Sequence, residues 1–139
     1  MKDKLLKLLN NSYSPYSKFR VSSIVVLKDG KCYSGVNIEN SSYGATVCAE
    51  RVAIFKAVSE GYRKGDFKKI YVMCDSPKIS SSCFMCRQVI TEFFLPDNEI
   101  IFMNNLGEEE KYLVKDICPY PFDDNDLKEA RRWRAVLYL

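Results

Sequence analysis

The sequence predicts an α/β fold, a three-layer α/β/α sandwich around a mixed central sheet of about five strands. Segments with helical periodicity alternate along the chain with short β-branched runs, and this alternation is typical of layered α/β domains. The length of 139 residues, with 47% hydrophobic and 28% charged residues, suits one globular core. We therefore expect residues 1–139 to form a single domain.

Periodicity and turn signals define the N-terminal elements. An amphipathic helix spans about residues 5–10 and ends before Ser14-Pro15. The β-branched run 20–27 reaches Asp29-Gly30, a pair that favours a tight turn, and residues 31–37 return as a second strand. We expect an antiparallel hairpin as the first part of the sheet.

Helices and strands alternate after the hairpin. A loop rich in Asn, Ser and Gly leads into a helix over about 47–60. A short apolar strand at 69–75 precedes a serine-rich loop, after which a second helix begins near Cys83. A strand at 99–103 and a C-terminal helical stretch over about 126–136 complete the predicted order.

The net charge of +3 is mild, and the basic residues gather only near the C-terminus. A solvated helix face explains this run better than nucleic-acid binding, because diffuse charge alone does not define a phosphate site. The N-terminus lacks a signal-peptide pattern, and no stretch approaches the roughly 18 apolar residues of a membrane span, so we expect a cytoplasmic protein. The basic run consists of Lys128, Arg131, Arg132 and Arg134.

The most informative pattern is Cys48-Ala49-Glu50-Arg51, followed later by Cys83-Phe84-Met85-Cys86. A structural zinc site has four protein ligands, whereas a hydrolytic site has three and leaves one position open. The chain has three thiols in this pattern and no histidine. We predict that Cys48, Cys83 and Cys86 bind one Zn²⁺ per chain, in the arrangement of zinc deaminases.

Glu50 and Arg51 are the candidate functional residues beside these thiols. Glu50 follows the first thiol by two positions, so on a helix turn it lies near the metal without binding it and can shuttle the proton of an activated water. Helix N-termini favour the thiolate form of all three cysteines. Arg51 is a candidate donor to the sulfurs and would draw charge from them.

The cysteines allow two other interpretations, a structural zinc site and a redox pair. In the first, the zinc is structural and Cys32, Cys74 or Cys118 supplies a fourth ligand, but these three lie at isolated positions without a paired spacing. In the second, Cys83 and Cys86 form a redox pair, which would leave Cys48 and Glu50 without a role.

Motifs at several separated places carry a resemblance to a known family. The chain resembles the small homotetrameric, zinc-dependent cytidine deaminases over nearly its whole length. The motifs are Ser14-Pro15-Tyr16-Ser17-Lys18-Phe19, Asp29-Gly30-Lys31, Gly35-Val36-Asn37-Ile38-Glu39-Asn40, Tyr43-Gly44, Cys48-Ala49-Glu50-Arg51, the helical segment 55–61 and Cys86-Arg87-Gln88-Val89-Ile90.

The resemblance implies hydrolytic deamination of cytidine and 2′-deoxycytidine to the uridine products, in pyrimidine salvage, with Glu50 as the proton shuttle. It also implies a nucleoside site and a homotetramer in which subunits share active sites. Asn37 and Glu39 match positions that bind the ribose 3′-hydroxyl, and Phe19 matches an aromatic residue against the pyrimidine. The remaining implied substrate contacts are the loop at Tyr43, the backbone of Ala49, and Phe122 reaching a neighbouring subunit.

Residue types alone leave these substrate assignments open. Phe19 and Phe122 could be core aromatics, and Asn37 and Glu39 could cap the following helix or face solvent. Other functions were also weighed: deamination of a modified cytosine nucleoside of the blasticidin-S type, binding or editing of a polynucleotide, and a catalytically silent zinc protein.

The chain departs from the family pattern at three places. Ser82 and Phe84 stand where the family usually has Pro and Gly, and we expect loss of the proline to free the loop before Cys83. Ser22-Ser23 stands where Gly-Ala is usual, so the pocket shape could differ. The C-terminal segment 133–139 is longer than the family minimum.

Overall fold

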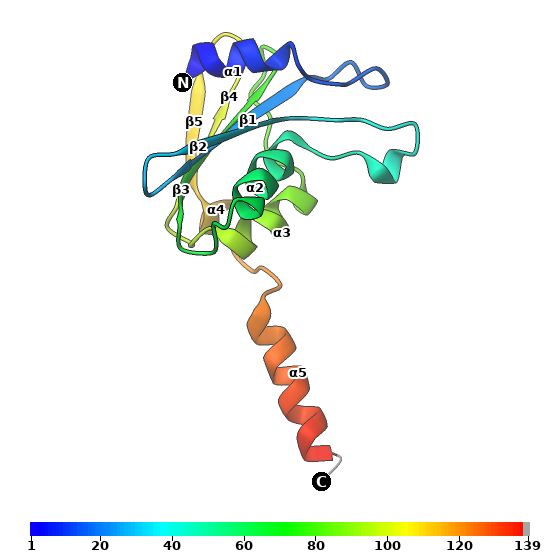
Figure 1. The fold of residues 1–139 in the computed structure, drawn as a ribbon, viewed down its shortest axis with the longest axis vertical. Coiled ribbons are helices and arrows are strands. Elements are labelled where there is room, and N and C mark those ends of the chain that lie inside the picture. Colours follow the sequence, from blue (N-terminus) through cyan, green and yellow to red (C-terminus); the bar gives the residue numbers. More distant parts are fainter. Residues whose placement is uncertain (138–139) are drawn as a thin grey trace.

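A mixed sheet of five strands forms the centre of the fold, with helices on both faces (Figure 1). The computed structural model describes residues 1–137. The strands are β1 (Val21–Leu27), β2 (Cys32–Val36), β3 (Phe67–Cys74), β4 (Glu99–Met103) and β5 (Glu109–Leu113). The helices are α1 (Lys2–Leu9), η1 (Tyr43–Ala45, a 3₁₀ turn), α2 (Ala49–Ser59), α3 (Phe84–Phe93), α4 (Val114–Ile117) and α5 (Asp124–Leu137).

The strand order confirms the predicted α/β/α sandwich with a mixed sheet. The order is β2-β1-β3-β4-β5, and only the β3–β4 pair is parallel. The first two strands form the expected antiparallel hairpin, whose register runs from Ser22 opposite Val36 to Val26 opposite Cys32. Gly30 in the turn has φ of 89°, a conformation that glycine adopts without strain.

Alternation along the strands sends apolar side chains into two separate cores. On β1, Ile24 packs under α1, whereas the next residue, Val25, joins the larger core beneath α2 and α3. The same alternation continues on β4, where Ile101 faces α1 and Phe102 faces the larger core. Each face of the sheet is therefore covered by helices, which holds α2 and α3 side by side on one of them (Figure 1).

The buried serine pair of β1 joins this strand to helix α1 and to the neighbouring strand β3. The Ser22 hydroxyl donates to the Leu5 carbonyl of α1 at 2.9 Å, and the Ser23 hydroxyl donates to the Tyr71 carbonyl of β3 at 2.9 Å. Both side chains are fully buried. The departure at Ser22-Ser23 therefore places two hydrogen-bonded hydroxyls between packed elements.

Two C-terminal elements were not among the predicted ones. Strand β5 pairs antiparallel with β4, from Glu99 opposite Leu113 to Met103 opposite Glu109, and α4 follows it directly. The strand lies at the sheet edge, four of its five residues are exposed, and it begins with two glutamates. Such a charged edge strand lacks the apolar alternation that identifies a half-buried one.

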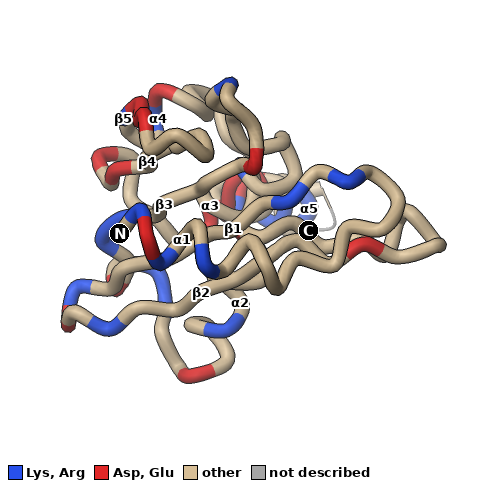
Figure 2. Tube along the Cα trace, turned by 90° about the horizontal axis from the view of Figure 1, so that it is seen from above, with Lys and Arg blue, Asp and Glu red and all other residues tan. Residues whose placement is uncertain are grey.

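Helix α5 extends away from the sheet and its covering helices (Figure 1). None of its described residues is buried, and the expected helix over 126–136 lies within it. Its basic residues are exposed and partly paired, with Lys128 Nζ 2.6 Å from Asp124 and Arg132 3.2 Å from Glu129. In Figure 2, basic and acidic positions are interspersed along the chain.

No helix among residues 1–137 is both long and apolar enough to cross a membrane. The C-terminal segment 133–139 lies in α5 up to Leu137, and its last two residues lie outside the described part of the chain.

Candidate metal centre and adjoining cavity

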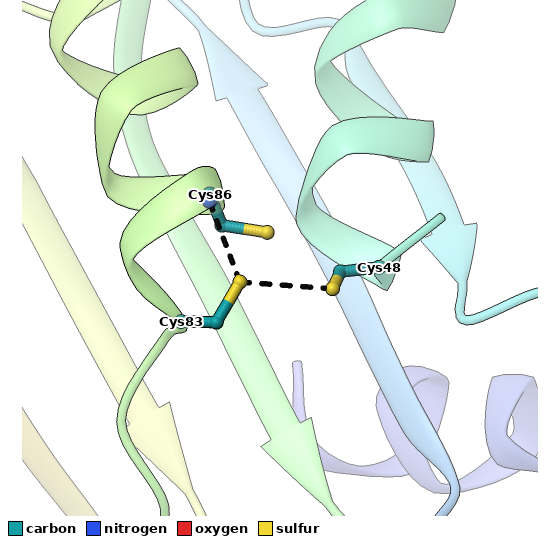
Figure 3. A group of neighbouring side chains, drawn as sticks. All are labelled: Cys48, Cys83 and Cys86. Carbon is teal, nitrogen blue, oxygen red and sulfur yellow. Dashed lines mark hydrogen bonds between the residues drawn. The ribbon is translucent and has the colours of Figure 1, made fainter. Parts of the chain in front are cut away.

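The N-termini of α2 and α3 bring three cysteines together (Figure 3). Cys48 is the N-cap residue of α2, Cys83 is the N-cap residue of α3, and Cys86 lies in the first turn of α3. The sulfur atoms of all three lie within 4.8 Å of one another. The predicted placement of the thiols at two helix N-termini is therefore confirmed.

The spacing of the sulfurs fits a tetrahedral zinc ion. Two thiolates bound to zinc at about 2.3 Å lie about 3.8 Å apart in a tetrahedron, and Cys48 Sγ is 3.8 Å from Cys83 Sγ. Among residues 1–137 the cluster contains three thiols and no further ligand group. Cys74 donates instead to the Lys78 carbonyl at 3.2 Å. A three-cysteine set that leaves the fourth position open agrees with a hydrolytic zinc site and not with a four-cysteine structural site.

Interactions among the thiols and with Arg51 shift the pKa values of Cys48 and Cys86 in opposite directions. The pKa of Cys48 is lowered to about 5, mainly by a hydrogen bond from Cys86 and further by the hydrogen bond and positive charge of Arg51. The hydrogen bond between Cys86 and Cys48, together with burial, raises the pKa of Cys86. Arg51 Nη2 lies 3.6 Å from Cys48 Sγ, and its buried Nε has no hydrogen-bond partner among residues 1–137. Arg51 therefore brings positive charge to the sulfurs, as its position in the motif suggested.

Glu50 is a buried carboxyl group beside the thiols. It lies in the first turn of α2 with 4% of its surface exposed. Its Oε1 accepts a hydrogen bond of 2.6 Å from the hydroxyl of Ser82, which is also 4% exposed. Burial raises the pKa of Glu50 above its ordinary value, and the Ser82 hydrogen bond opposes this effect. The sequence singled out Ser82 only as a departure from a proline, and its contact with Glu50 was not predicted.

A cavity of about 260 Å³ opens beside Glu50 and the thiols. Six residues predicted for the site line it, and they come from four places in the chain: the segment before β1, the segment after β2, the start of α2 and the N-terminus of α3. These residues are Phe19, Asn37, Glu39, Cys48, Glu50 and Cys83. Thr46, Val72, Cys74 and the serines of the loop before α3 also line it. These last residues carried no motif of their own, although the serine-rich run from Ser80 marked their loop.

Asn37 and Glu39 organise the polar end of the cavity. Asn37 Oδ1 accepts from the Ser12 hydroxyl at 2.5 Å and from the Val21 amide at 2.9 Å, while Nδ2 donates to the Phe19 carbonyl at 2.7 Å. Glu39 Oε1 accepts from the amides of Tyr16 and Ser17 at 3.0 and 3.1 Å. Neither residue caps the following helix, whose N-cap is Cys48.

Three predicted substrate residues do not line this cavity in the described chain. Tyr43 is 76% exposed and borders a neighbouring depression that shares Glu39 and Thr46 with it. Ala49 is fully buried under the turn that carries Glu50. Phe122 is 57% exposed, and its carbonyl accepts from Gln88 Nε2 at 2.8 Å, so it is not a core aromatic.

Comparison with known proteins gives relatives of similar length. A cytidine deaminase of Sporosarcina psychrophila is 43% identical over 124 residues, which cover 89% of this chain and 90% of that protein. A blasticidin-S deaminase of Bacillus cereus is 31% identical over 117 residues, covering 78% and 81% of the two chains. The crystal structure of a cytidine deaminase from Burkholderia pseudomallei matches the fold with a TM-score of 0.80 and 36% identity, covering 88% of this chain and 99% of that one.

The family match extends over the part of the chain that contains the cysteines. The profile described as the cytidine and deoxycytidylate deaminase zinc-binding region matches residues 1–103 of the 139. That span includes both helix N-termini and every sulfur of the cluster. The three-cysteine cluster fits the zinc ion that this family binds, and the chain belongs to the cytidine and deoxycytidylate deaminase family.

Proposed function

We propose that this chain is a cytidine deaminase, a hydrolase that converts cytidine and 2′-deoxycytidine to uridine and 2′-deoxyuridine with release of ammonia. The observation that carries the proposal is the buried Glu50 carboxyl group, which shares one cavity with two of the clustered thiols. A site that only held zinc would have no use for a buried, costly carboxyl group at this position. The similarity to cytidine deaminases supports the choice of substrate.

The chemistry needs a nucleophilic water and a group that moves protons. Zinc held by Cys48, Cys83 and Cys86 supplies a Lewis acid that makes water nucleophilic near neutral pH. Glu50 takes the proton that the attacking water gives up and passes it to the ring nitrogen of the pyrimidine. It then takes the proton of the new hydroxyl group at C4 and delivers it to the amine, so that the C4–N bond breaks, ammonia leaves and C4 keeps a carbonyl oxygen. Burial raises the pKa of Glu50 above its ordinary value, and this direction favours a carboxyl group that accepts a proton as well as releasing one.

Arg51 adjusts the charge of this site. Three thiolates with one Zn²⁺ carry a net charge of −1, which weakens a Lewis acid. The guanidinium 3.6 Å from Cys48 Sγ offsets part of that charge, as partners of metal ligands commonly do. We assign Arg51 to this role.

The polar end of the cavity is proposed to bind the sugar. Asn37 uses one amide N–H for the Phe19 carbonyl and keeps a second for a ribose hydroxyl. The Glu39 carboxylate accepts two backbone amides and has lone pairs left for the same group. Phe19 is 41% exposed and lines the cavity, where its ring can pack against the pyrimidine. Ala49 is assigned a backbone contact with the base.

A homotetramer with shared active sites is proposed for the assembly. Phe122 and Tyr43 are exposed in the single chain, as expected for groups that meet a second subunit. The surface around Cys83 carries two further apolar side chains, Phe84 with 76% and Met85 with 64% exposure. Sedimentation velocity gives the assembly directly, and Phe122→Ala should raise KM without changing the zinc content if Phe122 enters a neighbour's site.

The cellular role is proposed to be pyrimidine salvage in the cytoplasm, with residues 1–139 acting as one domain. The product of the proposed reaction is a uracil nucleoside, which a salvage route would consume. No step of the proposed chemistry needs nucleic acid or a membrane.

The test of the function is the loss of the cytosine absorbance band when purified, zinc-analysed protein is incubated with cytidine or 2′-deoxycytidine. The proposal expects both bands to be replaced by those of the uracil products, with one ammonia released per turnover. If neither changes while one zinc is bound per chain, the substrate assignment is wrong. Blasticidin S would then be assayed next, because a blasticidin-S deaminase is among the relatives.

A further inference from the structure

The Ser82 hydroxyl connects the loop before α3 to the carboxyl group of α2. Ser82 Oγ donates to Glu50 Oε1 at 2.6 Å, and both side chains have only 4% of their surface exposed. The two residues lie 32 positions apart in the chain, so the contact exists only because α2 and α3 pack together. Of the side chains that affect the Glu50 carboxyl group through a hydrogen bond, Ser82 has the larger effect on its pKa and the Cys86 thiol the smaller.

Ser82 is itself held in place. Its carbonyl accepts from Arg87 Nε at 2.9 Å, and the same guanidinium donates to the Ile117 carbonyl and to the Ser81 hydroxyl, both at 2.7 Å. We expected the absence of proline here to free the loop before Cys83. The structure shows instead a loop fixed by hydrogen bonds on both sides of Ser82.

A carboxyl group that moves protons needs a fixed orientation, because proton transfer requires the donor and acceptor atoms to lie within hydrogen-bond reach. A glutamate side chain has three rotatable bonds, and burial alone does not select one orientation of its carboxyl plane. Ser82 engages Oε1, and Glu50 is one of the residues that line the cavity. The Ser82 hydroxyl can donate to an oxygen of the ionised carboxylate and equally to the unprotonated oxygen of the neutral acid. It can therefore keep this contact whether or not Glu50 carries a proton.

We propose that Ser82 is a positioning residue for the reaction: its hydroxyl holds the Glu50 carboxyl group in the orientation in which Oε2 faces the substrate. A proline at this position restrains the backbone but has no group that can donate to Glu50. In this chain the serine therefore joins the loop and the carboxyl group by one contact. The inference rests on the proposed function, because it assigns Ser82 a part in the same reaction.

The kinetic test compares zinc-loaded wild type with Ser82→Ala and Ser82→Thr on cytidine. Loss of one hydrogen bond to a charged group should lower kcat about tenfold. KM should stay within about twofold of wild type, because Ser82 is buried and is not among the residues described as lining the cavity. Threonine keeps the hydroxyl and should restore most of kcat. In a Glu50→Gln background, Ser82→Ala should cause no further loss, because a residue that acts through Glu50 has nothing left to position.

Zinc content and crystal structures give readouts that do not depend on turnover. Ser82→Ala should bind zinc as the wild type does, and its Glu50 side chain should occupy a new or second rotamer where the wild type has one. An unchanged kcat, an equal loss in the Glu50→Gln background, or a single unchanged Glu50 rotamer in Ser82→Ala would each overturn the proposal. If the wild type itself deaminates neither nucleoside, the proposed function fails, and the rotamer comparison still decides whether Ser82 positions Glu50.

Discussion

Gly35 of β2 lies directly against Ala49, the first residue of α2. A Cβ atom added to Gly35 would fall 2.5 Å from the Ala49 carbonyl oxygen and 2.6 Å from the Ala53 amide nitrogen. Real Cβ contacts are essentially never this short, and both atoms belong to helix backbone that cannot rotate away. The missing side chain of Gly35 therefore sets how closely α2, with Cys48 and Glu50 at its start, approaches the sheet.

Gly35→Ala should destabilise the protein by about 2 kcal/mol, within the range for overpacking a core. It should also lower activity, because the N-terminus of α2 must shift. Thermal or urea unfolding measures the first effect and the cytidine assay the second. Gly44→Ala is the matched control for stability, since a Cβ there meets no atom within 4 Å. Equal stability of the two variants would show that β2 and α2 are not packed as described.

Cys83→Ala should abolish zinc binding and lower the melting temperature to that of chelator-treated wild type. Three thiols are the full protein ligand set in the described chain, and two ligands hold zinc far more weakly than three. Atomic emission analysis of the dialysed protein measures the zinc. Cys32→Ala removes an exposed thiol outside the cluster and should retain about one zinc per chain. Full zinc content in Cys83→Ala would mean that this thiol is not a ligand.

Glu50→Gln should reduce kcat on cytidine by about 10²- to 10⁴-fold, the usual worth of a general acid–base group, while zinc and fold are retained. Glutamine keeps the shape of the side chain and can accept the Ser82 hydrogen bond, but its amide group does not act as a proton donor and acceptor for catalysis as a carboxyl group does. Circular dichroism and zinc analysis accompany the kinetics. Glu60→Gln, at the exposed C-terminal end of α2, serves as the control and should leave kcat unchanged. Substantial activity in Glu50→Gln would refute the proton-shuttle assignment.

Arg51→Gln should lower activity or zinc affinity by about 10- to 100-fold, the range seen when partners of metal ligands are removed. The reason is the loss of the guanidinium 3.6 Å from Cys48 Sγ, which leaves the thiolate charge without compensation. Competition with a chromogenic chelator measures the affinity. Arg131→Gln on α5 removes the same charge from an exposed site and controls for net charge. If the two variants behave alike, Arg51 has no special relation to the sulfurs.

Asp75→Asn should reduce the loss in the free energy of unfolding that occurs when the pH falls from 7 to 3. Hydrogen bonds from Arg20, first, and Asn105 lower the pKa of Asp75 below its ordinary value of 3.8. A carboxyl group with a lowered folded-state pKa stabilises the protein above its unfolded pKa, and this contribution is lost as the pH falls below about 4. The pair is partly exposed, so we expect about 0.5–1 kcal/mol. Urea unfolding at pH 7 and pH 3 tests this. A wild type that loses no more stability than Asp75→Asn between these pH values would contradict it.

Local patterns in the sequence predicted most of the helices and strands and the three cysteines that lie together. Asp29-Gly30 identified the hairpin because a tight turn demands particular residues. The spacing of the cysteines predicted a three-thiol cluster because a metal site needs a defined number of donors, and each thiol lies at a helix start that the sequence indicated. The edge strand β5 was missed because charged residues on an exposed strand follow no apolar alternation.

Contacts between distant segments were decided only by the tertiary structure. Cys48 and Cys83 are 35 positions apart, and their 3.8 Å separation depends on how α2 and α3 pack on the sheet. The Ser82–Glu50 hydrogen bond and the arrangement around Asn37 arise in the same way. A sequence carries residue types and local spacing, whereas a hydrogen bond depends on distances of a few tenths of an ångström set by the packing of whole elements. The residue types of the candidate ligands and of the proposed proton carrier could thus be predicted from the sequence, and their mutual orientation could not.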